Sequence, residues 1–465
     1  MRLFLQKLKR RHCDGPGGIS ALLPIAIPMI VSSVFDTLMT FIDRLFMAHV
    51  GKEHIAACMS GGITSWLCLT LFAGLIGYSS TLVAHHYGAK RYEECPKVVF
   101  QGIILAFVSY PLALAASYFA AMTFELAGHD PIQIELERRY FWYMAFGGIL
   151  ALLRSAFAAF FAGIGKTKVI MRANAVAVVV NVVANYVLIF GKCGFPALGI
   201  DGAAIGTLLS SACMTGLIGA SFWRHACQKP FRTRQFARLD PYNLKTLLRF
   251  GAPNGLENLL GMASFVAINS AMHSYGADAA AAITIVFSWD LVMFFPLIGL
   301  QVGVSTLVGQ NLGAGDIPAA ERSAYSGFKL TFWYSALGVF FFCVFPHLLV
   351  GVFTPDIPGV DYQAARDLAI PMLRVASLYL MFDGVVLIAS GALRGAGDTL
   401  AVMLITVTLH WLSAALTLAG AYYFNWQPMT AWVALVISFI AGSIVLCIRF
   451  KQGKWKQIRM LEPAV

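Results

Sequence analysis

Five carboxylic acids lie inside long apolar stretches of this 465-residue chain, where simple packing does not explain them. They are Asp36, Asp43, Glu257, Asp290 and Asp383. An ionisable side chain within an apolar helix is costly, so each of these acids is a functional candidate by default. Burial favours the neutral form of a carboxylic acid, which lets it take up a proton near neutral pH or bind a cation. The five acids therefore suggest coupling to a proton or sodium gradient.

Each acid also has a plainer explanation, which is a permanent ion pair with a basic residue of the same apolar stretches. Those basic residues are Arg44, Arg154, Arg249, Lys329 and Arg374. Asp36 and Asp43 are seven residues apart and share one helix face. Asp36 is therefore predicted to be a partner of Asp43 or to line a wet cavity.

Several other side chains are weaker candidates. Asn181 and Asn185 are four residues apart, so they share a helix face as cation ligands or as interhelical hydrogen-bond partners. Trp66 and Trp289 are candidates for a cavity that binds aromatic cations, with lipid contact or packing as the alternative. His410, like the pair His85–His86, is interpreted as a polar residue near a helix end rather than as a proton relay.

The composition excludes a soluble globular protein. Hydrophobic residues make up 58% of the chain and charged residues 12%, whereas about 25% of an ordinary globular chain is charged. The mean hydropathy of +0.72 is too high for a surface in water. Disorder is excluded because the chain contains 35 Phe, 16 Tyr and 9 Trp residues. What remains is a protein that crosses the lipid bilayer several times.

Twelve apolar stretches are long enough to span a bilayer core of about 30 Å, which needs roughly 20 helical residues. They are continuously apolar rather than alternating, which favours helices over a β-barrel. The predicted spans are 19–49, 55–85, 97–124, 140–164, 169–191, 198–223, 246–275, 280–308, 320–352, 367–393, 400–424 and 430–450. The sequence therefore predicts an all-α membrane protein.

The Lys and Arg residues between these spans are distributed asymmetrically. With the N-terminus inside, 24 of them lie in cytoplasmic segments and 5 on the opposite side. Positively charged loops are retained in the cytoplasm, so both termini are predicted to be cytoplasmic. The net charge of +11 is thereby explained by topology and anionic headgroups, and no nucleic-acid partner is expected.

The second half of the chain repeats the first at a shift of about 225 residues. The string STLV at 80–83 recurs at 305–308, and the pattern Gly-x-Gly-x-Thr at 163–167 recurs at 395–399. Two parallel halves of six helices are a transporter architecture. The predicted organisation is a cytoplasmic segment 1–18, an N-lobe 19–223, a basic linker 224–245, a C-lobe 246–450 and a cytoplasmic tail 451–465.

The sequence gives little support for an enzymatic function. The chain contains no compact set of nucleophile and base or of metal ligands, and the glycines at 163–165 do not form a P-loop. The nine cysteines are scattered without a CxxC pair, which indicates reduced thiols. Neither a membrane enzyme nor an ATP-driven pump is predicted, and no cofactor is expected beyond a coupling ion.

Short strings along the chain resemble the MATE family, the multidrug and toxic compound extrusion transporters. The resemblance extends over residues 20–450 and rests on the order and spacing of the strings rather than on any one of them. The strings are Ile42-Asp43-Arg44-Leu45-Phe46, Ala84-His85-His86-Tyr87-Gly88-Ala89, Asn181 to Asn185 with Leu188-Ile189-Phe190-Gly191, Gly202-Ala203-Ala204, Gly251-Ala252-Pro253-Asn254-Gly255-Leu256-Glu257-Asn258, Val308-Gly309-Gln310-Asn311-Leu312-Gly313 and Arg394-Gly395-Ala396-Gly397-Asp398-Thr399.

The resemblance implies two pseudo-symmetric six-helix bundles in a V shape. It also implies that Asp43 matches the first-helix acid tied to coupling, and that Asp383 matches a C-lobe acid of NorM-type members, with Na⁺ as a candidate ligand. Two departures leave the coupling ion open. Asn185 replaces an acid of DinF-type members, and Gly261 replaces the seventh-helix acid of NorM-type members. Glu257 lies one turn before Gly261, which displaces its side chain by about 6 Å along the helix axis.

Together these observations predict a monomeric antiporter of a bacterial inner membrane. As the resemblance implies, it exports drug-like, cationic organic compounds in exchange for H⁺ or Na⁺. Asp43 and Asp383 are the leading coupling residues, and the supporting candidates are Glu257, Asp290, Asn181, Asn185 and Asp36. The alternative function is flipping of a lipid-linked precursor, for which a strongly cationic cavity is expected.

Overall fold

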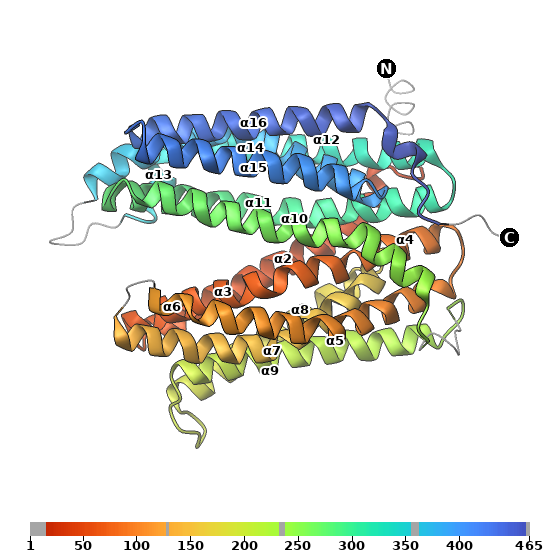
Figure 1. Cartoon of the computed structure of the whole chain (residues 1–465), viewed down its shortest axis with the longest axis horizontal. Coiled ribbons are helices and arrows are strands. Elements are labelled where there is room, and N and C mark those ends of the chain that lie inside the picture. The colour runs from red at the N-terminus through yellow and green to blue at the C-terminus, as the bar shows by residue number, and fades with distance from the viewer. Residues whose placement is uncertain (1–14, 127–129, 232–237, 355–361, 462–465) are drawn as a thin grey trace, which may run out of the picture. The chain divides into compact units, whose positions relative to one another are not determined.

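The computed structural model describes residues 15–126, 130–231, 238–354 and 362–461, and these ranges are helical without any β-strand (Figure 1). Two groups of predicted cytoplasmic charges, in residues 1–14 and 232–237, lie outside the described residues.

The first half of the chain contains α2 (Ile19–Ala48), α3 (Lys52–Gly77), α4 (Ser79–Gly88), α5 (Glu94–Ala121), α6 (Thr123–Leu126), α7 (Pro131–Gly163), α8 (Lys168–Phe190) and α9 (Ile200–Ala226). The second half contains α10 (Pro241–His273), α11 (Ala277–Gly313), α12 (Ile317–Val344), α13 (Pro346–Gly351), α14 (Gln363–Gly395), α15 (Thr399–Tyr422), α16 (Pro428–Lys451) and the short 3₁₀ helix η1 (Lys454–Gln457).

Eleven helical stretches of the described chain are long and apolar enough to cross a membrane, and they coincide with eleven of the twelve predicted spans. The remaining predicted span, 246–275, is also helical and corresponds to α10. Its hydropathy is lower than that of the other eleven helices, because the polar residues Asn254, Glu257 and Asn258 lie in its middle. A polar stripe on a membrane helix indicates a face that does not contact lipid.

The described residues divide into two compact units. The N-terminal unit contains the described residues of 27–259, 309–315 and 460–461, and the C-terminal unit contains those of 15–26, 260–308 and 316–459. Each unit is thus built mainly from one half of the chain, and α10 contributes its first part to one unit and its last part to the other.

Helix packing within each unit follows from small residues and buried aromatic side chains. In the N-terminal unit α7 packs against α3, α5 and α9. In the C-terminal unit α14 packs against α12 and α16, and α16 also packs against α15 (Figure 1). Trp432 of α16 is 1% exposed, and its Nε1 donates a hydrogen bond of 3.0 Å to the Met372 carbonyl oxygen. This bond satisfies the polar atom of a large core side chain.

The sequence repeat reappears as equivalent helix contacts in the two units. A Cβ atom at Gly163 would lie 2.6 Å from the Ser80 carbonyl oxygen, and one at Gly395 would lie 2.5 Å from the Ser305 carbonyl oxygen. Both distances are too short for a real Cβ atom, so glycine is required where the backbones approach. These four residues occupy matching positions of the repeat, which confirms the predicted pseudo-symmetry.

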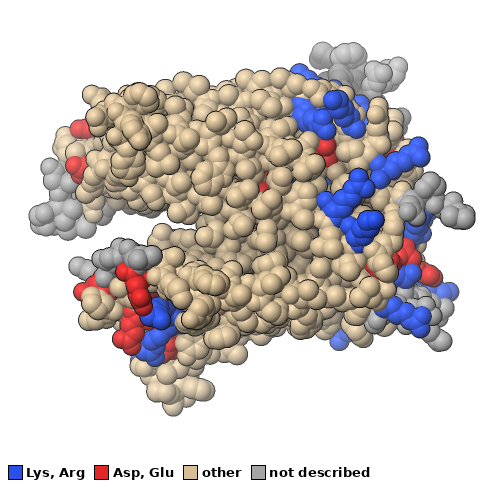
Figure 2. Space-filling view, in the orientation of Figure 1, with Lys and Arg blue, Asp and Glu red and all other residues tan. Residues whose placement is uncertain are grey.

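Charged side chains are concentrated at the helix ends of each unit (Figure 2). In the C-terminal unit, the last turn of α16 and the η1 helix carry Arg449, Lys451, Lys454 and Lys456. In the N-terminal unit, the ends of the helices near α6 carry acidic and basic side chains together, including the Glu125–Arg138 pair at 2.8 Å. The apolar bodies of the helices between these ends are the surfaces expected to contact lipid.

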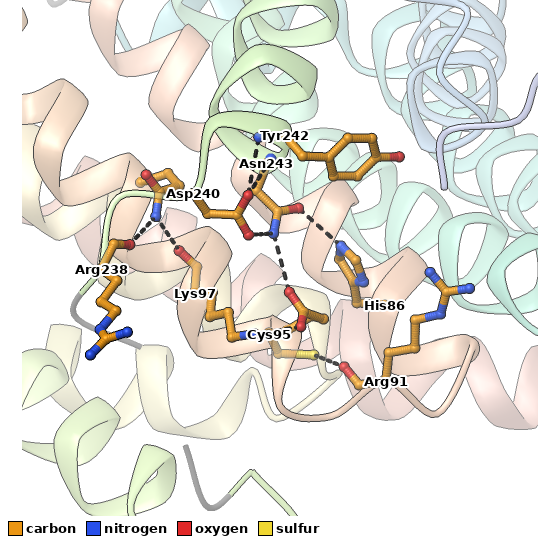
Figure 3. A network of polar contacts seen from close by, with 10 residues as sticks. His86, Arg91, Cys95, Lys97, Arg238, Asp240, Tyr242 and Asn243 are labelled. Carbon is orange, nitrogen blue, oxygen red and sulfur yellow. Dashed lines mark hydrogen bonds and ion pairs between the residues drawn. The ribbon is translucent and has the colours of Figure 1, made fainter. Parts of the chain in front are cut away.

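A network of polar contacts attaches the beginning of α10 to α4 and α5 in the N-terminal unit (Figure 3). Asn243 Nδ2 donates to Asp240 Oδ2 at 2.8 Å and to Glu94 Oε2 at 3.3 Å. Asn243 Oδ1 lies 3.2 Å from His86 Nε2. His86 is buried in the last turn of α4, as the sequence predicts for a residue near a helix end. The network ties the chain that follows the basic linker to the body of the unit.

Candidate functional site

The first candidate site lies in the N-terminal unit and centres on Asp43, near the end of α2. Asn185 Nδ2 donates a hydrogen bond to Asp43 Oδ1, and the Thr207 hydroxyl donates to Asp43 Oδ2 at 3.4 Å. Asn185 Nδ2 also lies 3.4 Å from Asn181 Oδ1. Asp43 is 8% exposed and both asparagines are fully buried. These four residues are called the Asp43 cluster below.

The helices position this cluster through spacing and close approach. Asn181 and Asn185 are one turn apart on α8, so both face the same side, as the sequence predicts. α9 packs against α8, and a Cβ atom at Gly206 of α9 would overlap Asn185 Oδ1. Gly206 therefore leaves the space that the Asn185 amide occupies beside Asp43.

The hydrogen-bond partners of Asp43 are neutral amide and hydroxyl groups. Arg44 interacts with Asp43 electrostatically, but no described basic residue forms a salt bridge with it. Asn185 Oδ1 is buried and has no hydrogen-bond partner among the described residues. Hard cations prefer carboxylate, amide and hydroxyl oxygens. The Asp43 cluster can therefore hold a proton or one small cation.

Two members of this environment carry no signal in the sequence. Thr207 and Tyr140 interact with each other, and Tyr140 is 5% exposed next to Cys58. Isolated hydroxyl groups are common in apolar helices, because a Ser or Thr hydroxyl can donate to a carbonyl of the preceding turn. Only the packing of α7 and α9 reveals that these hydroxyl groups lie near Asp43.

Asp36 has different surroundings from Asp43, although both lie on α2. Its side chain is exposed, and it interacts with Arg154 and with Asn174. Asn174 Nδ2 in turn donates to the backbone and side-chain oxygens of Ser32, each at 2.9 Å. Asp36 therefore has a basic neighbour of the kind that the ion-pair explanation requires.

The second candidate site lies in the C-terminal unit and contains Asp290 of α11 with Tyr379 and Asp383 of α14. The Tyr379 hydroxyl is a hydrogen-bond partner of Asp290, and Asp290 and Asp383 interact electrostatically. Both acids are half-buried, whereas Tyr379 is 7% exposed. Neither acid forms a salt bridge within the described part of the chain. Two such neighbouring carboxyl groups repel each other when both are ionised.

A small pocket lies beside Asp383, between α14, α15 and α16. Its polar lining consists of Asp383, Thr406, His410, Ser413 and Ser438. The cavity volume is about 30 Å³, whereas one water needs roughly 10–15 Å³ and drug-sized ligands occupy about 300–1,000 Å³. The pocket therefore suits a small ion or a few waters. It is called the Asp383 pocket below.

His410 is the residue whose position the sequence interpretation got wrong. It lies near the middle of α15 rather than at a helix end, and its side chain lines the Asp383 pocket. Tyr379 was also missed, although a signal exists, because it precedes Asp383 by four residues and shares its helix face.

The remaining candidates lie apart from these two clusters. Glu257 is 7% exposed on the part of α10 that belongs to the N-terminal unit. Trp66 is 43% exposed on α3. Trp289 Nε1 donates a hydrogen bond of 3.0 Å to the Leu349 carbonyl oxygen, and its ring meets Phe353 at 6.0 Å. These contacts of Trp289 are packing contacts within the C-terminal unit.

Comparison with known proteins places this arrangement in a family. The MatE family model matches residues 28–187 and 253–418, which together make up most of the chain and fall one in each half. The chain belongs to the MatE family. As a MatE member it is a membrane transporter and not an enzyme, in agreement with the sequence analysis.

Two similar proteins are each named "Probable multidrug resistance protein NorM". The protein from Synechococcus sp. is 27% identical over 436 residues, covering 92% of this MatE chain and 93% of the relative. The protein from Thermotoga maritima is 24% identical over 446 residues, covering 95% of this chain and 94% of the relative. Both matches extend over nearly the full length of each chain.

Solved structures share the fold of this MatE protein. A MOP superfamily transporter from Pyrococcus furiosus has a TM-score of 0.84 at 20% identity, covering 94% of this chain and 96% of that one. A structure described as the outward-facing conformation of a multidrug resistance MATE family transporter has a TM-score of 0.83 at 20% identity, with the same coverage. The predicted all-α MATE fold is thereby confirmed.

Proposed function

We propose that this MatE-family chain is a secondary active antiporter that exports drug-like organic compounds, in particular cations, in exchange for H⁺ or Na⁺. Export of drugs is supported by the multidrug-resistance names of the relatives. The alternative, flipping of a lipid-linked precursor, is not favoured by those names. The observation that carries ion coupling is the neighbouring pair Asp290 and Asp383, which forms no salt bridge within the described residues.

This pair supplies a physical reason for binding a cation. When Asp290 and Asp383 are both ionised they repel each other, and a proton on one of them or a small cation beside Asp383 weakens that repulsion. The Asp383 pocket, which Asp383 lines and Asp290 does not, has room for a small ion but not for a drug-sized compound. The coupling ion and the exported compound are therefore proposed to bind at different places.

Exchange requires that each ligand prefer a different conformation of the transporter. A ligand that binds two conformations equally well shifts nothing, however tightly it binds. We infer that the ion stabilises one conformation through the Asp290–Asp383 pair and that the exported compound stabilises another. The Asp43 cluster is proposed as a second coupling site, with Asp36 and Glu257 in supporting roles.

The location and orientation follow from the charges. We propose a bacterial inner membrane, both termini in the cytoplasm and a monomeric protein with lobes at 19–223 and 246–450. Lys and Arg residues of the last turn of α16 and of η1 support a cytoplasmic C-terminus. Trp66 and Trp289 are proposed to lie near the path of the exported compound, where an aromatic ring would attract an organic cation.

Transport in everted membrane vesicles tests this function. The fluorescent cation ethidium is loaded outside, and its accumulation is followed after a pH gradient or a sodium gradient is imposed. We expect Asp383→Asn to abolish gradient-driven accumulation while the protein remains in the membrane at wild-type amounts, because an amide cannot carry the negative charge that binds the ion.

A second acid of the same helix provides the control. Asp367 is exposed near the beginning of α14, and Asp367→Asn is expected to transport ethidium as the wild type does. Undiminished transport by Asp383→Asn would remove Asp383 from the coupling mechanism. Failure of the wild type to respond to either gradient would refute antiport itself.

A further inference from the structure

The structure brings a histidine and an acid from different helices to one small pocket. Asp383 of α14 and His410 of α15 both line the Asp383 pocket, together with the hydroxyl groups of Ser413 and Ser438. The two hydroxyl oxygens lie 2.6 Å apart. The His410 ring also meets the Phe439 ring at 5.8 Å with an interplanar angle of 72°. The imidazole is therefore held at the wall of a pocket that fits an ion.

Residue 261 of α10, which lies near His410, is a glycine and has no side chain. A Cβ atom at Gly261 would lie 3.8 Å from His410 Nδ1, which is ordinary van der Waals contact. In this chain residue 261 is glycine, so position 261 supplies no second carboxylate to the pocket.

α14 and α16 line the Asp383 pocket together with His410, and α11 is linked to the pocket through Tyr379. α14 contributes Asp383, and α11 contributes Asp290, which is linked to the site through Tyr379. The Tyr379 ring packs 6.0 Å from Phe439, which in turn contacts His410. From α16 the pocket receives Ser438 and Phe439, which carry no charge. Asp383 is therefore the carboxylate that the described lining of the pocket presents beside the imidazole.

An imidazole nitrogen is a poor ligand for Na⁺. Histidine gains and loses a proton within the physiological pH range, whereas hard metal cations prefer oxygen ligands to imidazole nitrogen. A protonated His410 would also place a positive charge beside the carboxylate that Na⁺ would need. Two positive charges within one pocket of about 30 Å³ repel each other strongly where water is excluded.

We propose that His410 sets the ion specificity of the Asp383 pocket and makes it select protons over Na⁺. This inference rests on the proposed antiport and identifies its coupling ion. A proton enters from the side of higher proton concentration and is held by the carboxylate oxygen of Asp383 or a ring nitrogen of His410. The same proton leaves on the cytoplasmic side as the organic cation is exported.

The test uses the full-length protein reconstituted in liposomes, with ethidium as the exported cation. Transport is energised separately by a pH gradient and by a sodium gradient, and the ratio of the two rates is measured. We expect the wild type to respond to the pH gradient and not to the sodium gradient. In His410→Asn, which offers an amide oxygen and no titratable nitrogen, the ratio is expected to fall at least about tenfold in favour of sodium, which corresponds to about 1.4 kcal/mol.

A matched histidine and a direct binding measurement complete the test. His347 is exposed in α13 of the same unit, and His347→Asn is expected to keep the wild-type ratio. Binding of radioactive sodium to detergent-solubilised protein, checked for folding by ethidium binding, is expected for His410→Asn and not for the wild type. The sodium-binding measurement on the wild type tests proton selectivity even if His410→Asn does not fold.

Three outcomes would overturn the inference. Ethidium transport by the wild type in a sodium gradient would refute proton selectivity while leaving antiport intact. An unchanged rate ratio in folded His410→Asn would show that His410 does not set specificity. Transport by the wild type in neither gradient would refute the antiport and, with it, this inference.

Discussion

The contact between Gly206 and Asn185 allows a sharp test of the Asp43 cluster. The substitution Gly206→Ala adds one methyl group at a position where it would lie 3.0 Å from Asn185 Cγ and would overlap Oδ1. The Asn185 amide must therefore rotate, or α8 must move away from α9. Either change removes the hydrogen bond that Asn185 donates to Asp43 Oδ1.

The size of the effect follows from that hydrogen bond. A hydrogen bond to a charged group contributes about 1.5–3 kcal/mol, which corresponds to roughly a 10- to 150-fold change in an equilibrium constant. Asn185 Nδ2 stabilises the ionised carboxylate of Asp43, so for a proton, which needs no amide ligand, loss of this donor favours binding. We expect Gly206→Ala to lower the half-saturating concentration of the coupling ion by this factor and to slow turnover, because the ion is released less readily.

The assay is ethidium transport at a series of ion concentrations, with two further variants. Asn185→Ala removes the same donor without adding volume at Gly206, and it is expected to give the same shift. Gly216, on the same helix, has open space where its Cβ would lie, so Gly216→Ala should behave as the wild type does. If Gly206→Ala and Asn185→Ala both kept the wild-type ion dependence, Asp43 would not take part in coupling.

Two predictions concern stability, measured as the free energy of unfolding or the melting temperature in detergent. Gly395→Ala should cost about 1–3 kcal/mol through overpacking, because its Cβ would lie 2.5 Å from a carbonyl oxygen of α11, whereas Gly351→Ala has open space and should change little. Arg449→Gln removes two hydrogen bonds, of 2.8 and 2.9 Å, to the buried Asp398 carboxylate, and should cost about 1.5–3 kcal/mol. The exposed Lys451 provides the control, and equal losses for Arg449→Gln and Lys451→Gln would contradict this role of the Asp398 pair.

Local information was sufficient for much of the candidate site. The four-residue spacing of Asn181 and Asn185 predicts a shared face, and their amides lie 3.4 Å apart. The same spacing would have found Tyr379 beside Asp383. In both cases the partners lie on one helix, so their relative positions follow from helix geometry alone.

The spacing of residues along the sequence does not predict which residues of different helices contact one another. His410 is 27 positions along the chain from Asp383, and nothing near either residue indicates that α14 and α15 present them to one pocket. Thr207 and Asp43 lie on helices separated by most of the N-lobe. Such pairs depend on how each helix is rotated about its axis, which is decided by packing against several neighbours.

The amino-acid sequence by itself determined that this chain is a helical membrane protein made of two similar halves with acids in its apolar stretches. It could do so because a bilayer permits few backbone structures, and a run of about 20 apolar residues leaves the helix as the solution. The tertiary structure alone decided which acids have neutral partners, which have a basic neighbour and which share a pocket with a histidine. Those environments arise where distant segments meet, and there the rotation of each helix determines which side chains face one another.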